Sequence, residues 1–120
     1  MSTCILVVED NAPVGKMIQA MLTRYGYQVH WAVSGVSALA TAASAFPVLV
    51  LLDMTLPDMA GTEVLNRLKT SRPALPVLVM TGLFSDPGDA FAAGGDGLLS
   101  KPFTLHQLAE AVEDFVGAPQ

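Results

Sequence analysis

One stretch of this sequence constrains the fold more than any other: a run of apolar residues that ends in a single carboxylate. Residues 48–52 are all apolar, Asp53 follows them directly, and a turn containing Pro57 and Gly61 comes next. An apolar run without alternation is typical of a strand covered on both faces, as in a parallel sheet. Because an unpaired carboxylate is costly to bury, Asp53 is predicted either to meet a cation or to lie at an exposed rim where ligands bind.

The rest of the chain alternates between apolar stretches and segments with helical periodicity. Apolar, partly β-branched runs predict four further strands, at residues 4–8, 27–33, 76–81 and 98–101. The second of these carries His30 and Trp31, and its mixed polarity predicts an edge position with both side chains at or near the surface.

Helices are predicted between successive strands and after the last one. Pro13 opens the first helix and Gly26 ends it, Ser34 caps the second, and the third follows Gly61. A short fourth helix is predicted from Asp86 to the glycines at 94–95, and a capping box of Thr104 and Gln107 begins the fifth. Three helices have an apolar face predicted to be buried: Val14, Met17, Ile18, Met21, Leu22 and Tyr25 in the first, Val36, Leu39, Ala40 and Ala43 in the second, and Leu105, Leu108, Ala109, Val112, Phe115 and Val116 in the last.

Five strands alternating with five helices indicate an α/β fold, a doubly wound parallel sheet with right-handed crossovers. Helices on both faces of the sheet make three layers. The 120 residues are predicted to form one domain, residues 1–120 with a core of 3–117, and the 52% hydrophobic share means that much of the chain is buried.

Composition excludes several classes of protein. The net charge is −5 and the six Lys and Arg residues are scattered, which argues against nucleic-acid binding by this chain. No apolar run approaches the roughly 20 residues of a membrane span, and the N-terminus has no signal-peptide pattern, so a cytoplasmic protein is expected. The single cysteine, Cys4, forms no intramolecular disulfide and is predicted to be a buried small residue.

Four of the predicted strands end in polar residues. Glu9 and Asp10 follow the first strand, Asp53 ends the third, Thr81 ends the fourth and Lys101 ends the fifth. In doubly wound sheets, ligands bind outside the carboxyl ends of the strands, so these side chains are expected to share one rim. Three carboxylates this close repel one another, and one lysine does not neutralise them. A hard divalent cation such as Mg²⁺ is the natural completion of this site.

A divalent cation beside a carboxylate, a lysine and a hydroxyl forms a site for a phosphoryl group. The metal ion and the lysine would neutralise charge on the phosphoryl oxygens, and the hydroxyl of Thr81 would donate a hydrogen bond to the phosphoryl group. A carboxylate in this position can act as the nucleophile and become an acyl phosphate.

These motifs, in this order and spacing, resemble the receiver domain of two-component response regulators over residues 3–117. The resemblance implies a flavodoxin-like sheet with strand order 2-1-3-4-5. It implies that Asp53 is the phosphoacceptor and, with Asp10 and the backbone carbonyl of Thr55, a ligand of Mg²⁺ (or Mn²⁺). Glu9 would assist the metal through a water molecule.

The resemblance also assigns the phosphoryl-binding residues. Thr81 would read the phosphoryl group and move with it, Lys101 would pair with it, and the Lys101–Pro102 bond stands where the family usually has a cis peptide. This chain departs from the family at Leu98, because members usually carry Phe or Tyr there as a switch coupled to the threonine. The segment before it is slightly short and glycine-rich, so we expect a short, weakly held fourth helix.

The resemblance implies partners as well. A histidine kinase or histidine phosphotransfer protein would donate the phosphoryl group, and a downstream protein would bind the face formed by the fourth helix, fifth strand and fifth helix. The domain would catalyse its own phosphorylation and dephosphorylation without turning over a separate substrate, so it is not expected to be an enzyme. It is expected to be either a stand-alone receiver or the N-terminal receiver of a longer protein.

Three alternatives stay open at this point. A haloacid-dehalogenase-type phosphatase also uses Asp, Thr, Lys and Mg²⁺, but its general acid stands two residues after the nucleophile, where this chain has Thr55. A flavodoxin-like cofactor module would need a phosphate-binding loop after the first strand, where Glu9 and Asp10 are electrostatically wrong. A degenerate receiver would bind partners without being phosphorylated.

Overall fold

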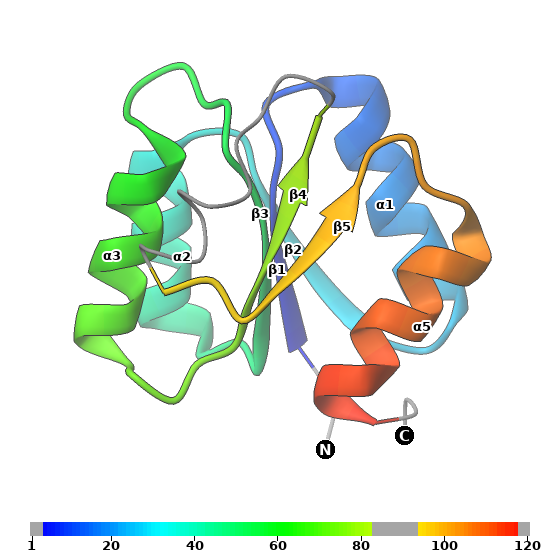
Figure 1. Cartoon of the computed structure of the whole chain (residues 1–120). Coiled ribbons are helices and arrows are strands. Elements are labelled where there is room, and N and C mark those ends of the chain that lie inside the picture. The colour runs from blue at the N-terminus through cyan, green and yellow to red at the C-terminus, as the bar shows by residue number, and fades with distance from the viewer. Residues whose placement is uncertain (1–3, 83–93, 118–120) are drawn as a thin grey trace.

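The sheet of this protein contains five parallel strands in the order β2-β1-β3-β4-β5 (Figure 1). A computed structural model of the chain describes residues 4–82 and 94–117. The strands are β1 (Cys4–Val8), β2 (Gln28–Ala32), β3 (Leu49–Asp53), β4 (Val77–Thr81) and β5 (Gly97–Ser100). The described helices are α1 (Ala12–Arg24), α2 (Gly35–Ala45), α3 (Gly61–Ser71) and α5 (Leu105–Val116). The α/β fold and its strand order are therefore confirmed, whereas the predicted helix at 86–93 lies outside the described residues, as does the expectation that it is weakly held.

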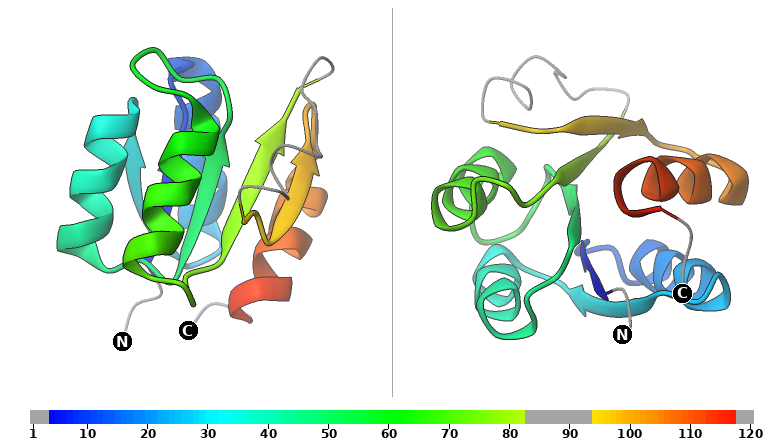
Figure 2. Two further views of the ribbon diagram at one scale, coloured as in Figure 1. Left: turned by 60° about the vertical axis from the view of Figure 1, so that its left-hand side comes forward. Right: turned by 90° about the horizontal axis from the view of Figure 1, so that it is seen from below.

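The two faces of the sheet are covered by different helix pairs, which gives the three layers predicted (Figure 2). One buried cluster joins the sheet to α2 and α3, through residues such as Leu6, Val50 and Val64. A second cluster on the other face joins the sheet to α1 and α5, through residues such as Ile5 and Leu108. Alternate residues of each central strand enter opposite clusters, which explains why these strands are apolar without interruption.

The edge position of β2 agrees with its mixed sequence. His30 is exposed and Trp31 is half-buried, as expected, and among the described strands β2 pairs with β1 alone. Cys4 is buried in β1, also as expected. Among the described helices, none is both long and apolar enough to cross a bilayer.

Several predicted faces are wrong in detail, most clearly that of α2. Its buried residues are Gly35, Ala38 and Ala42, while Val36 is 63% exposed. The helix lies so close to its neighbours that a Cβ atom on Gly35 would be 2.5 Å from the Met59 side chain, so small residues face inward. The predicted apolar faces of α1 and α5 were also too wide, because three of their large apolar residues are exposed: Met17, Tyr25 and Leu105.

The N-terminus of α2 is capped twice. Ser34 accepts a hydrogen bond from the amide of Ser37, as its sequence position predicted. In addition, the carboxylate of Asp58, in the loop after β3, accepts the amides of Gly35 at 2.8 Å and Val36 at 2.9 Å. The first amides of a helix lack partners within the helix and carry partial positive charge, so a carboxylate stabilises them. The hydrogen bonds from Gly35 and Val36 lower the pKa of Asp58 below its usual range.

An Asp58→Ala variant is therefore expected to melt at a lower temperature than the wild type, with a difference that depends on pH. Because the folded-state pKa is lowered, the stabilisation is present above the ordinary pKa of an aspartate and is lost as the pH falls through the lowered value. Thermal melts followed by circular dichroism should show a difference in melting temperature between the two proteins at about pH 7, and this difference should disappear toward about pH 3. Asp114→Ala, which removes an exposed acid from α5, is the control; a gap of constant size would contradict the assignment.

Candidate functional site

The polar residues at the strand ends meet at the carboxyl edge of the sheet. Glu9 and Asp10 directly follow β1, and Asp53 is the last residue of β3. Oxygen atoms of these three carboxylates lie within 4.8 Å of one another. Glu9 is 1% exposed and Asp53 is also buried, whereas Asp10 is exposed to solvent. In this acidic cluster, Glu9 and Asp53 are thus buried, and Asp10 lies at the solvent-exposed side.

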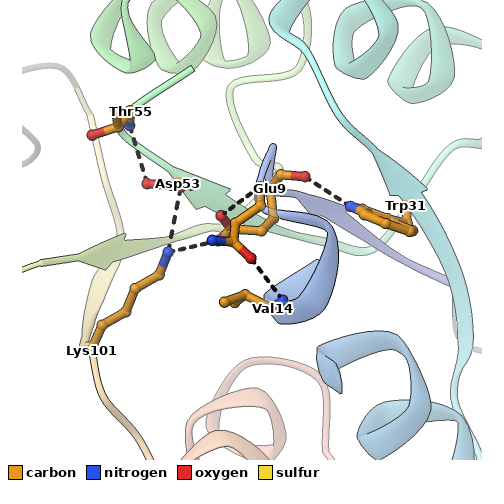
Figure 3. A network of polar contacts seen from close by, with 7 residues as sticks. Glu9, Val14, Trp31, Asp53, Thr55 and Lys101 are labelled. Atoms are coloured by element: carbon orange, nitrogen blue, oxygen red, sulfur yellow. Dashed lines mark hydrogen bonds and ion pairs between the residues drawn. The ribbon is translucent and has the colours of Figure 1, made fainter. Parts of the chain in front are cut away.

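Lys101 reaches this cluster from the end of β5 (Figure 3). Its Nζ atom lies 2.6 Å from Oε2 of Glu9 and 3.4 Å from Oδ2 of Asp53, and its side chain is 26% exposed. The backbone amide of Lys101 donates to the carbonyl of Thr81 at 2.7 Å. The lysine therefore pairs mainly with Glu9 and less closely with Asp53.

The pKa values show the electrostatic imbalance of the cluster. Burial raises the pKa of Glu9, the neighbouring Asp53 raises it further, and Lys101 only partly opposes both effects. Burial alone would lower the pKa of Lys101, but the hydrogen bond to Glu9 and the charges of Asp53 and Glu9 outweigh it, so this pKa is raised. The cluster thus holds more negative charge than one ammonium balances, and its oxygen donors are of the type that Mg²⁺ prefers.

The loop after β3 orients the Asp53 carboxylate. The amide of Thr55 donates to Oδ1 of Asp53 at 3.1 Å (Figure 3), so Thr55 lies beside the carboxylate. A Cβ atom on Gly61 would be 2.5 Å from Cα of Met54, so the start of α3 packs directly against the backbone that follows Asp53. Only glycine fits at this position without a shift of the loop.

The remaining predicted site residues lie on β4 and β5. Thr81 is buried at the end of β4. Leu98 is half-buried in β5, beside Val79, and packs against the cluster that faces α2 and α3. The peptide bond between Lys101 and Pro102 is cis.

One residue that the sequence did not point to, Trp31, contacts the backbone of a member of the acidic cluster. The indole Nε1 of Trp31 donates to the carbonyl of Glu9 at 2.8 Å (Figure 3). From the sequence, Trp31 was expected only to lie at or near the surface of an edge strand. The signal that could have found it is the strand order, because in the order 2-1-3 the end of β2 lies beside the end of β1.

Comparison with known proteins agrees with this geometry. The family model for the response regulator receiver domain matches residues 5–113. A crystal structure of a CheY-like response regulator receiver domain protein from Methanospirillum hungatei superposes with a TM-score of 0.90 at 30% identity, covering 95% of this chain and 93% of that one. The receiver domain of NtrX from Brucella abortus superposes with a TM-score of 0.86 at 29% identity, covering 93% and 97%.

Sequence relatives are of the same kind. The probable transcriptional regulatory protein TcrX of Mycobacterium tuberculosis is 37% identical over 106 residues, which cover 87% of this chain and 45% of TcrX. The response regulator MprA of Mycobacterium bovis is 38% identical over 110 residues, covering 90% and 48%. This chain thus spans about half the length of these relatives.

The fold and the arrangement of the acidic cluster are those of a receiver domain. The chain belongs to the response regulator receiver domain family of two-component signalling. Because the chain belongs to this family, it is neither a haloacid-dehalogenase-type phosphatase nor a flavodoxin-like cofactor module.

Proposed function

We propose that this receiver takes a phosphoryl group onto Asp53 from a histidine kinase or histidine phosphotransfer protein in the cytoplasm. Mg²⁺ (or Mn²⁺) would be held by Asp10, Asp53 and the backbone carbonyl of Thr55, with Glu9 acting through water. The observation that carries the proposal is the cluster of three carboxylates within 4.8 Å at the carboxyl edge of the sheet, faced by the ammonium of Lys101.

The chemistry follows from the side chains in place. A carboxylate oxygen of Asp53 attacks the phosphorus atom, the P–N bond of phosphohistidine breaks, and its electron pair goes to the imidazole nitrogen, which takes up a proton. A cation held by these residues would neutralise charge on the phosphoryl oxygens. Lys101 leaves Glu9 and pairs with the phosphoryl group, and the hydroxyl of Thr81 donates a hydrogen bond to it. Hydrolysis of the acyl phosphate resets the switch, so no separate substrate is turned over.

The output surface would include β5 and α5, together with the predicted fourth helix, which lies outside the described residues. Differential contacts to Thr81 and Lys101 shift the population of the two states that this surface adopts. Leucine at position 98 has no ring to swing between two positions, so we assign the switching movement to Thr81 and Lys101. The whole domain, residues 1–120 with a core of 3–117, acts as one switch that binds protein partners and no nucleic acid.

Intact-mass spectrometry after incubation with acetyl phosphate tests this proposal. The wild type should gain one phosphoryl group when Mg²⁺ is present and none when the metal is chelated. Asp53→Asn should gain none, whereas Asp114→Asn, which changes an exposed acid on α5 away from the site, should still be phosphorylated.

A degenerate receiver that docks partners without phosphorylation is the second candidate, favoured by Leu98. A folded sample that binds Mg²⁺ but gains no phosphoryl group would support it and overturn the phosphoacceptor role of Asp53.

A further inference from the structure

The backbone of Glu9 is held by β2 at both of its polar atoms. Its amide donates to the carbonyl of Ala32 at 3.0 Å, which extends the β1–β2 pairing by one residue. Its carbonyl accepts the indole N–H of Trp31 at 2.8 Å. Glu9 is thus fixed from the edge strand at the point where the chain leaves β1 and enters the loop that carries Asp10.

The indole of Trp31 can reach this carbonyl because α1 leaves space for its ring. An ideal Cβ atom on Gly15 would lie 2.3 Å from Cε2 of Trp31 and 2.4 Å from its Nε1, so the ring lies directly against the helix backbone at that glycine. Any larger residue at position 15 would displace the ring. Glycine is unfavourable in a helix interior. The close approach of Trp31 explains why a glycine stands at position 15.

The side chain of Glu9 depends on the same loop geometry. Its Oε1 atom accepts the amide of Asn11 at 3.2 Å, and its Oε2 atom accepts Lys101. Asn11 in turn caps α1 by accepting the amide of Val14 at 3.1 Å. The indole hydrogen bond, the position of Glu9 and the start of α1 therefore form one connected set of contacts (Figure 3).

We propose that Trp31 is a positioning residue for the divalent-cation site: by holding the backbone of Glu9, with its ring seated on Gly15, it keeps the carboxylates of Glu9 and Asp10 in the arrangement that binds the metal. This inference rests on the proposed function, because it takes the acidic cluster as the cation site. Groups that orient metal ligands typically affect affinity without touching the metal.

Isothermal titration calorimetry with Mg²⁺ tests the proposal on the whole chain. Trp31→Phe keeps an aromatic ring and removes the N–H donor, and it should weaken Mg²⁺ binding about fivefold, the effect of losing one hydrogen bond. Tyr27→Phe is the matched control, because Tyr27 also donates from an aromatic ring to a backbone carbonyl, that of Gly117, at 3.0 Å. Tyr27→Phe should leave Mg²⁺ affinity unchanged.

A double-variant cycle separates positioning from general destabilisation. Gly15→Ala should weaken Mg²⁺ binding in the wild-type background because it displaces the indole. In a Trp31→Ala background the space is free, so Gly15→Ala should have no further effect on the affinity. Additive losses in the two backgrounds would contradict the proposal.

Nuclear magnetic resonance supplies a direct signal, since Trp31 is the single tryptophan of the chain. Its one indole N–H resonance should shift during a Mg²⁺ titration with the affinity found by calorimetry. If Trp31→Phe binds Mg²⁺ as tightly as the wild type does, the positioning role of Trp31 is overturned, while the proposed metal site stands. Absence of Mg²⁺ binding by the wild type would overturn the proposed metal site itself, and this inference with it.

Discussion

Replacing Lys101 by methionine is expected to lower the free energy of unfolding at neutral pH by about 3 kcal/mol. The change removes the ammonium that lies 2.6 Å from Glu9 and 3.4 Å from Asp53, while methionine keeps a similar apolar stem. Breaking a buried ion pair leaves a charge without a partner, and the low end of the usual range applies because Lys101 is 26% exposed. Urea denaturation followed by circular dichroism measures the loss.

The loss should depend on pH and on Mg²⁺. The pKa of Glu9 is already raised by burial and by Asp53, with Lys101 opposing, so removing the lysine raises this pKa further. A carboxyl with a raised folded-state pKa binds its proton more tightly in the folded state, so stability falls as the pH rises through that pKa. The variant should therefore approach the wild type as the pH falls toward about 4, the ordinary pKa of a glutamate, and differ most above neutrality. Mg²⁺ should stabilise the variant more than the wild type, because it replaces the missing positive charge.

Lys69→Met is the matched control for this experiment. Lys69 is also a partly buried lysine, with its Nζ atom 2.8 Å from Asp96 and 2.9 Å from the carbonyl of Leu75. These contacts lie near the start of β4, at the opposite edge of the sheet from the acidic cluster. Its variant should lose stability without responding to Mg²⁺. Equal responses to Mg²⁺ in both variants would contradict the assignment of Lys101 to the cation site.

The main features of the fold could be predicted because each depends on local sequence. Uninterrupted apolar runs define strands that are buried on both faces, and the alternation of strands with helices sets a parallel sheet. The polar residues that end β1, β3, β4 and β5 then have to share one edge, which is why Glu9, Asp10 and Asp53 could be placed together from the sequence.

What could not be predicted depends on contacts between distant segments. Val36 has the spacing of a buried residue, but the close approach of α2 to Met59 places Gly35, Ala38 and Ala42 inward. No local pattern indicates that Asp58 caps a helix that begins 23 residues earlier. The hydrogen bond from Trp31 to the Glu9 carbonyl likewise joins residues 22 positions apart. Periodicity specifies which residues are apolar, and tertiary packing selects which of them are covered.

These unpredicted contacts have a common location. Trp31, on β2, holds the loop after β1, and the first amides of α2 hold Asp58 in the loop after β3. The unit formed by β2 and α2 carries none of the predicted site residues, yet it contacts both loops that present the acidic cluster. Substitutions in this unit are therefore expected to act on the site through the position of those loops.

Replacing Gly61 by alanine is expected to cost about 2–3 kcal/mol of stability and to weaken Mg²⁺ binding as well. The added Cβ atom would lie 2.5 Å from Cα of Met54 and 2.8 Å from its carbonyl oxygen. These are backbone atoms, which cannot rotate away as a flexible side chain would, so the loop itself has to shift. Met54 lies between Asp53 and Thr55, so a shift there disturbs both the carboxylate and the amide that orients it.

Urea denaturation and calorimetric Mg²⁺ titration measure the two effects of Gly61→Ala separately. Gly82→Ala is the control, because among residues 4–82 and 94–117 no atom comes within 4 Å of a Cβ atom placed on Gly82, and that glycine also adjoins a strand end of the site. Its stability should stay within about 0.5 kcal/mol of the wild type. If Gly61→Ala is as stable as the wild type, the loop after β3 shifts without a loss of stability, which contradicts the expected loss of about 2–3 kcal/mol. A loss of stability with unchanged Mg²⁺ affinity would mean that the position of this loop does not govern the cation site.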